Sequence, residues 1–168
     1  TNGELLMSKY QDLSKTFAES VQLQAQYVSE CCGFSNFFFL QMAAYLEWPK
    51  DQLTFAPDEN SQTEESICSN NSVHLRDDGN IHFFALFTIN RFDNINHRSQ
   101  LIFPFKVKKL EDSFLLTIPG LVEEVLLSTE DTQEMTNVYE TLCAAMKSYF
   151  DTPYLDFTSE DFLRRTLP

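Results

Sequence analysis

The sequence predicts an α+β fold in which helices flank an antiparallel meander of four to five strands. The stretch 80–118 holds three runs of apolar residues, rich in β-branched and aromatic side chains, and polar turn segments separate them. Helical periodicity of the apolar residues appears on both sides of this stretch. Because strands and helices are segregated along the chain, an α+β domain is favoured over a doubly wound parallel sheet, and 168 residues fit one domain over 1–168.

Two N-terminal helices are expected before the sheet. The first, over 4–30, is amphipathic and is expected to end at Gly33. Its apolar positions recur every three or four residues: Leu6, Tyr10, Leu13, Phe17, Val21, Ala25 and Val28. The second, over 35–48, is apolar almost all round and Pro49 closes it. This pattern predicts a buried core helix, and the alternative is that part of it forms a partner-binding or oligomer face.

The acidic, turn-rich segment 49–71 is expected to be a long and mobile loop. Strands are then expected over 72–76, 81–90, 100–110, 113–118 and 122–127, followed by a long helix over 130–150 and a short tail helix over 159–165. Strand 81–90 is apolar at both alternate sets of positions, which predicts cover on both of its faces.

Charge narrows the class of partner. The chain carries a formal net charge of −13, which would repel phosphate and argues against nucleic acid. The flanks are acidic, whereas the sheet region also carries a set of basic residues: Arg91, Arg98, Lys106, Lys108 and Lys109. These residues are predicted either to guard an edge strand against aggregation or to bind an acidic partner, which includes the chain's own loop 49–71.

Motifs for catalysis are missing from the sequence: there is no P-loop, dinucleotide fingerprint or Gly-x-Ser-x-Gly elbow. No cofactor or metal is expected, and an enzyme is disfavoured. If the first hairpin turns at Asp78-Gly79, Leu75 faces His82 and His74 faces Phe83, so the two imidazoles point to opposite faces. Four cysteines without CxxC spacing predict reduced thiols in the cytoplasm, and no apolar run is long enough to span a membrane.

The leading hypothesis is a non-catalytic cytoplasmic protein-binding module, with features shared by many bacterial accessory, chaperone-like and immunity proteins. It would recognise another protein, of basic character, through acidic helical surfaces or the sheet edge, and a homodimer is a further alternative. A second hypothesis is a small apolar ligand held between the aromatic helix and the sheet, in a pocket lined by Phe38, Tyr45, Trp48, Phe84 and Leu86. The third is an enzyme of unrecognised type.

Overall fold

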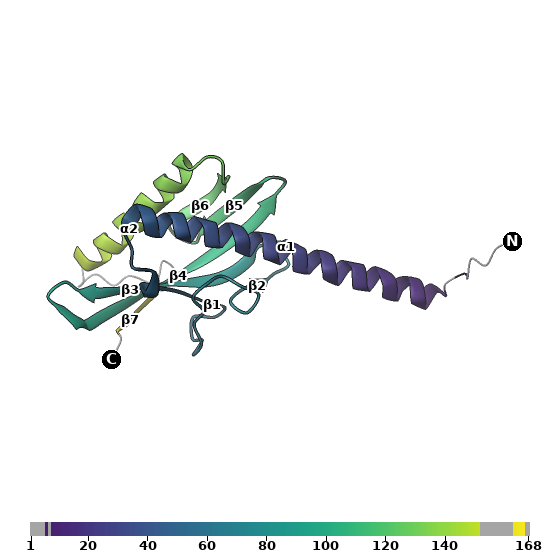
Figure 1. The fold of residues 1–168 in the computed structure, drawn as a ribbon, viewed down its shortest axis with the longest axis horizontal. Helices are drawn as coiled ribbons and strands as arrows, with labels where there is room; N and C mark the ends of the chain where they lie inside the picture. Colours follow the sequence, from purple (N-terminus) through teal and green to yellow (C-terminus); the bar gives the residue numbers. More distant parts are fainter. Residues whose placement is uncertain (1–5, 7, 152–162, 167–168) are drawn as a thin grey trace.

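The computed structural model describes residues 6, 8–151 and 163–166, and it shows an antiparallel sheet with two helices on one face (Figure 1). The elements in chain order are α1 (Lys9–Leu46), the 3-10 helix η1 (Lys50–Gln52), β1 (Leu53–Ala56), β2 (His74–Leu75), β3 (Ile81–Arg91), β4 (Asn94–Leu110), β5 (Ser113–Ile118), β6 (Val122–Leu127), α2 (Gln133–Asp151) and β7 (Leu163–Thr166). The predicted α+β class and antiparallel sheet are therefore confirmed. Within the described residues, no helix combines the length and apolar character needed to cross a bilayer.

The sheet has the strand order β1-β3-β4-β5-β6, with β2 also beside β3 and β7 also beside β4. β6 is one edge of this order, and its first half carries the exposed Glu123 and Glu124. The backbone of Glu124 is left-handed (φ 31°), and the β5–β6 register shifts between Leu116 and Ile118.

The core is an aromatic cluster between the sheet and the two helices. Phe83 of β3 and Phe105 of β4 stack with ring centroids 5.5 Å apart, and Phe39 of α1 meets Phe105 edge-on at 5.1 Å. The buried Tyr139 hydroxyl of α2 donates a hydrogen bond of 2.7 Å to the carbonyl of Phe38, so the helices are also joined to each other. Aromatic pairs of this geometry add about 0.5–1.5 kcal/mol each beyond the apolar area that they bury.

The two faces of β3 differ in cover, but both hold buried side chains. On the helix side, Ile81, Phe83, Ala85 and Phe87 are fully buried. On the other side, Leu86 is 2 % exposed and the partly buried Phe84 packs in a smaller cluster with Ala56 and Ile102. The apolar residues at both alternate sets of positions thus correctly predicted that this strand has buried side chains on both faces.

The two expected N-terminal helices are in fact one helix, because α1 runs through Gly33 without a break. Gly33 does not have a positive φ. A glycine at this position costs the helix about 1 kcal/mol relative to alanine. Buried neighbours on both sides of it, including Cys32 and Phe34, pack on the core and outweigh that cost. The true end follows Leu46, where Glu47 is left-handed (φ 53°) and the Trp48 amide bonds to the carbonyl of Ala43.

Three further boundaries differ from the prediction. β1 lies inside the expected loop 49–71, and it pairs with β3 through Leu53↔Phe87 and Phe55↔Ala85. β4 begins at Asn94 rather than at residue 100, because the segment expected as a loop forms the tip of a β3–β4 hairpin. The tail helix expected over 159–165 lies partly outside the described residues, and its last part, from Leu163, belongs to β7.

The predicted register of the first hairpin is wrong by one residue. His74 pairs with His82, and Leu75 pairs with Ile81. The reason is a longer turn, in which the Gly79 amide bonds to the Arg76 carbonyl and Gly79 takes a positive φ of 80°. The two imidazoles therefore share a face of the sheet, but each is beside its own carboxylate, Asp58 for His74 (3.6 Å) and Asp78 for His82 (2.9 Å).

Candidate interaction surface

The N-terminal half of α1 extends away from the rest of the molecule (Figure 1). All buried residues of this helix lie at or after Cys31, whereas residues 8–26 are exposed throughout. At a rise of about 1.5 Å per residue, residues 9–26 project about 27 Å. We call residues 9–26 the overhang.

The start of the overhang is set by its own residues. Ser8 and Gln11 form a capping box: the Gln11 amide donates to the Ser8 hydroxyl (3.2 Å), and the Ser8 amide donates to the Gln11 side-chain oxygen (2.9 Å). Asp12 adds negative charge in the first turn, where the helix dipole favours it. These contacts satisfy amides that a helix start leaves unpaired, so the helix begins here without help from the sheet.

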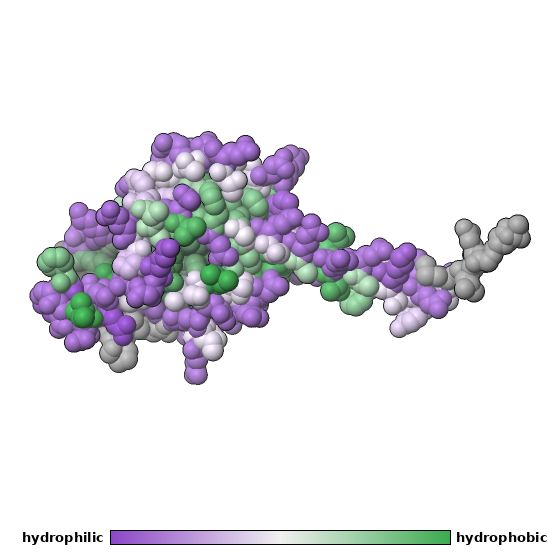
Figure 2. All heavy atoms as spheres, in the orientation of Figure 1, coloured by the Kyte–Doolittle hydropathy of each residue, from purple (hydrophilic) through white to green (hydrophobic). Residues whose placement is uncertain are grey.

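One face of the overhang is apolar and uncovered. Tyr10, Leu13, Phe17 and Val21 follow one another at steps of three and four residues, so they lie on one side of the helix. Their exposed fractions are 79 %, 68 %, 70 % and 49 %. We call these four residues the stripe; farther along α1 the same face carries the buried Cys31, Cys32, Phe38 and Met42. The face of α1 that packs on the sheet in its C-terminal half is therefore exposed to solvent in the overhang. Figure 2 shows apolar residues among the hydrophilic ones of the overhang.

The overhang carries two lysines and two acids, Lys9, Asp12, Lys15 and Glu19. By their spacing, Asp12, Lys15 and Glu19 fall on the side opposite the stripe, whereas Lys9 lies one turn before Leu13 at its margin. Their formal charges cancel, so the overhang is neutral in a chain of net charge −13. The overhang is therefore an apolar and neutral surface, whereas the sequence analysis expected binding through acidic helical surfaces or the sheet edge.

A hollow of about 260 Å³ lies where the overhang leaves the sheet. Its walls come from α1 and from the segment that leads into β2: Val21, Gln24, Ala25, Val28, Asn70, Val73 and Leu75. Val21 belongs to the stripe, so the hollow continues the apolar face onto the body of the molecule.

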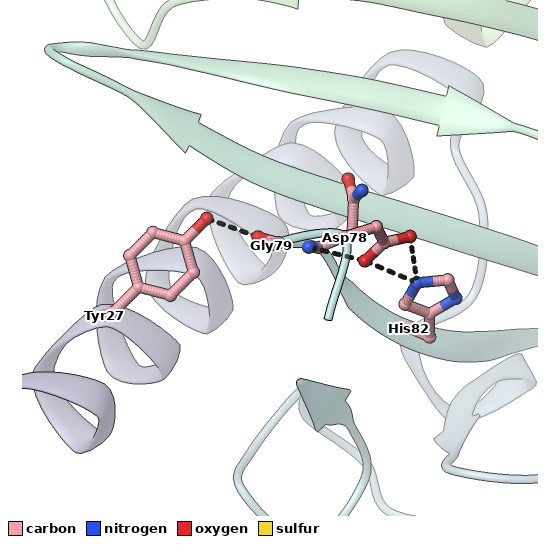
Figure 3. A network of polar contacts seen from close by, with 5 residues as sticks. Tyr27, Asp78, Gly79 and His82 are labelled. Atoms are coloured by element: carbon pink, nitrogen blue, oxygen red, sulfur yellow. Dashed lines mark hydrogen bonds and ion pairs between the residues drawn. The ribbon is translucent and has the colours of Figure 1, made fainter. Parts of the chain in front are cut away.

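Tyr27 ties α1 to the sheet just beyond the overhang. Its hydroxyl donates to the carbonyl of Gly79 (2.6 Å) and accepts from the amide of Lys109 (3.1 Å), and burial raises its pKa. In the same turn, Asp78 accepts from the Asn80 amide (2.9 Å) and lies beside His82 (Figure 3). These contacts lower the pKa of Asp78, first through the Asn80 amide and then through His82. The two hydrogen bonds of Tyr27 attach α1 to the β2–β3 turn and to the end of β4, just beyond the overhang.

The predicted basic set does not form one patch. Lys109 pairs with Glu30 of α1 (2.6 Å), and this hydrogen bond lowers the pKa of Glu30 and raises that of Lys109. Lys106 pairs with His82 in the sheet, and Lys108 lies near Gly79. At the β3–β4 hairpin, Arg91 at the end of β3 pairs with Asp93 (2.6 Å).

Arg98 lines a polar hollow of about 570 Å³ on the end of the sheet opposite the overhang. Its other walls are Asp51, Gln52, Thr54, Glu64, Thr88, Asn90, Ile95, Asn96 and Gln100. The Asn90 side-chain oxygen is buried here without a hydrogen-bond partner. The hollow offers groups of both charges, but the basic residues named in the sequence are spread along more than one side of the sheet.

The residues predicted for an apolar pocket are not brought together either. Phe38 is buried in the core between helices and sheet, and Trp48 packs edge-on against Phe87 on that same side. Phe84 and Leu86 belong to the separate cluster on the opposite face of the sheet. Tyr45 is exposed, where its hydroxyl bonds to the carboxylate of Glu140.

The four cysteines are free thiols, three of them buried and Cys143 exposed. Burial raises the pKa of Cys31 to about 11, which keeps it protonated and unreactive near neutral pH. The thiols of Cys32 and Cys68 interact, which lowers the pKa of Cys32 and raises that of Cys68. The Asn36 side-chain amide group holds the backbone of Cys68 through bonds of 2.8 and 2.9 Å. Among the described residues, no cluster of three or more His, Cys, Asp and Glu side chains is placed to hold a metal ion.

Comparison with protein families, with curated proteins and with solved structures finds no significant match for this chain.

The sequence predicted that the stripe residues share one face of an amphipathic surface helix, but it placed a partner-binding face on 35–48 only as the alternative to a buried core helix. The missing signal was the length of α1. A helix of 38 residues is about 57 Å long, and its contacts with the sheet begin only near Tyr27, so almost half of the helix extends beyond the sheet.

Proposed function

We propose that this chain is a non-catalytic protein-binding module of the cytoplasm, and that it binds another protein through the stripe on the overhang. The observation that carries the proposal is a contiguous, exposed apolar helix face, Tyr10, Leu13, Phe17 and Val21, on the half of α1 that extends from the body of the molecule. The four free cysteines support a reducing location.

The size of the exposed face supports this function. From their exposed fractions, the four stripe side chains present roughly 400 Å² of apolar surface. A patch of this size equals the largest apolar patches of ordinary monomers, which are often functional. Single exposed apolar residues are common, but four in a row on one helix face are not.

Helix energetics give a second argument. Most helices in proteins are stabilised by packing of their apolar face rather than by intrinsic propensity. The overhang has no such packing from the described residues, although its sequence keeps the apolar face that packing requires. A partner that covers the stripe supplies the missing contacts.

The chemistry of the stripe also selects the class of partner. The stripe residues carry no charge, and the four charged residues of the overhang have formal charges that cancel. A matching surface is therefore apolar, such as a helix or groove of a protein, and the net charge of −13 disfavours nucleic acid.

Photocrosslinking in living cells tests the proposal. p-Benzoylphenylalanine is placed at position 17 in place of Phe17, or at position 22 in place of Gln22 on the charged side as the matched control. We expect a discrete crosslinked protein at position 17 and little at position 22. Equal yields at the two positions, or no product at position 17, would refute a binding role for the stripe.

A further inference from the structure

The order of large and small residues along the stripe allows it to pair with a second stripe. Its midpoint lies near residue 15, so a second stripe laid antiparallel over it places Tyr10 opposite Val21 and Leu13 opposite Phe17. Each aromatic side chain then meets a smaller aliphatic one, the alternation of large and small residues that lets two surfaces interdigitate. A parallel arrangement would instead place Tyr10 on Tyr10 and Phe17 on Phe17.

Charge favours the same arrangement. The overhang is neutral, so the net charge of −13 resides on the remainder of the chain. In an antiparallel pair, the two bodies lie at opposite ends of the paired segment, which spans about 18 Å over residues 10–21. That separation exceeds the Debye length of about 8 Å at physiological salt, so repulsion between the bodies is largely screened. A parallel pair would bring the two acidic bodies together.

The hollow at the base of the overhang offers a place for the end of a second stripe. It is lined by Val21, Ala25, Val28 and Leu75, among others. In the antiparallel pair, Tyr10 of the second copy lies over Val21, at the mouth of this hollow. The aromatic ring finds apolar walls there, and its hydroxyl lies near the polar Gln24 and Asn70.

The buried area is sufficient for a specific dimer. Two stripes together bury roughly 800 Å² of apolar surface. The polar residues that flank the seam, Ser14, Ser20 and Gln24, bring the total to roughly 1,000 Å², near the lower limit of specific protein interfaces.

We infer that the stripe is covered by the stripe of a second copy of this chain, in an antiparallel helix pair. The inference rests on the proposed function, because it names the protein that the module binds. The overhang and the hollow at its base form one self-complementary surface, and a two-fold axis passes near residue 15 of both helices.

Light scattering coupled to size-exclusion chromatography tests whether two copies of the chain form a dimer. We expect the purified chain to show the mass of a dimer at high protein concentration and to dissociate on dilution. Phe17→Ser should weaken the pair about tenfold or more, and the matched control Gln22→Ser, on the opposite side of the same helix, less than about twofold. A single-chain mass at every concentration would overturn the inference.

Disulfide trapping tests the antiparallel order. Leu13→Cys and Phe17→Cys chains are prepared with Cys143→Ser, which removes the exposed thiol, then mixed and treated with oxidised glutathione. We expect the mixed species that links position 13 to position 17 to predominate. Links between identical positions would overturn the antiparallel arrangement.

The photocrosslinking experiment separates this inference from the proposed function. A product at position 17 that contains two copies of this chain supports both. A product with a different protein supports the binding role of the stripe but refutes the inference that its partner is a second copy of this chain. Absence of any product removes both.

Discussion

Replacement of Tyr27 by phenylalanine should loosen the attachment of α1 to the sheet. The Tyr27 hydroxyl makes two hydrogen bonds, to the Gly79 carbonyl (2.6 Å) and from the Lys109 amide (3.1 Å), and Tyr27→Phe removes both while the ring remains. Each such bond contributes about 0.5–1.5 kcal/mol, so the free energy of unfolding should fall by about 1–3 kcal/mol. Since the side chain is only partly buried, water can reach the freed groups, and the lower half of this range is expected.

Urea denaturation measures this effect, with the fluorescence of Trp48, the single tryptophan, as the probe. Trp48 packs against Phe87, so its emission reports on the core. The variants are made with Phe17→Ser, so that pairing of two copies does not enter the measured free energy. Tyr10→Phe is the control, because its exposed side chain should change stability by less than about 0.5 kcal/mol. If Tyr27→Phe and Tyr10→Phe unfold within about 0.3 kcal/mol of each other, the Tyr27 bonds do not secure the helix.

Three further predictions concern the core, the first hairpin and the response to pH. Phe83→Ala should destabilise the protein by about 3–5 kcal/mol in urea denaturation, because it leaves a cavity beneath the stacked Phe105; a loss under about 1 kcal/mol would contradict the aromatic core. Gly79→Ala should cost about 1–2 kcal/mol in the same assay, because its φ of 80° disfavours a side chain, and an unchanged midpoint would show a different turn. Burial raises the pKa of Cys31 from 9.0 to about 11, so its contribution is full below pH 9 and about 2–3 kcal/mol is lost as the pH rises to 11. Thermal unfolding should therefore depend less steeply on pH between 9 and 11 in Cys31→Ala than in the native chain, and parallel profiles would exclude a buried thiol.

Local signals predicted the C-terminal half of the sheet well. β5 and β6 have the bounds expected from sequence, because Glu111-Asp112 and Pro119-Gly120 are strong turn residues and the runs between them are continuous. Signals that depend on distant contacts failed. β1 is a strand of four residues, Leu53–Ala56, and only its pairing with β3 makes it one.

Glycine was the least reliable local signal. Gly33 was expected to end a helix, yet it lies within α1, since packing on both sides outweighs its modest propensity cost. Gly79 was expected within a two-residue turn, and its positive φ instead completes a longer one, which moves His74 opposite His82. A single glycine therefore shows that a turn or helix cap is possible at its position, but it does not determine whether a helix ends there or how long the turn is.

The residues of the candidate surface could be predicted from the sequence, but their exposure could not. Periodicity identified Tyr10, Leu13, Phe17 and Val21 as one apolar face, but sequence pattern cannot say whether a sheet lies beneath such a face. That depends on how far the helix runs past the strands, and the false break at Gly33 concealed its length. The basic residues were likewise visible in the sequence, but the strand register decides that Lys109 meets Glu30 while Lys106 lies beside His82.

The acidic edge of the sheet limits how far this molecule can assemble. A strand edge with free amides and carbonyls invites another strand, and repeated addition of that kind produces fibres. Glu123 and Glu124 place like charges on β6, and the left-handed backbone at Glu124 distorts the edge that an incoming strand would have to match. Polymerisation through this edge is opposed, which is compatible with the closed, two-fold helix pair that we infer.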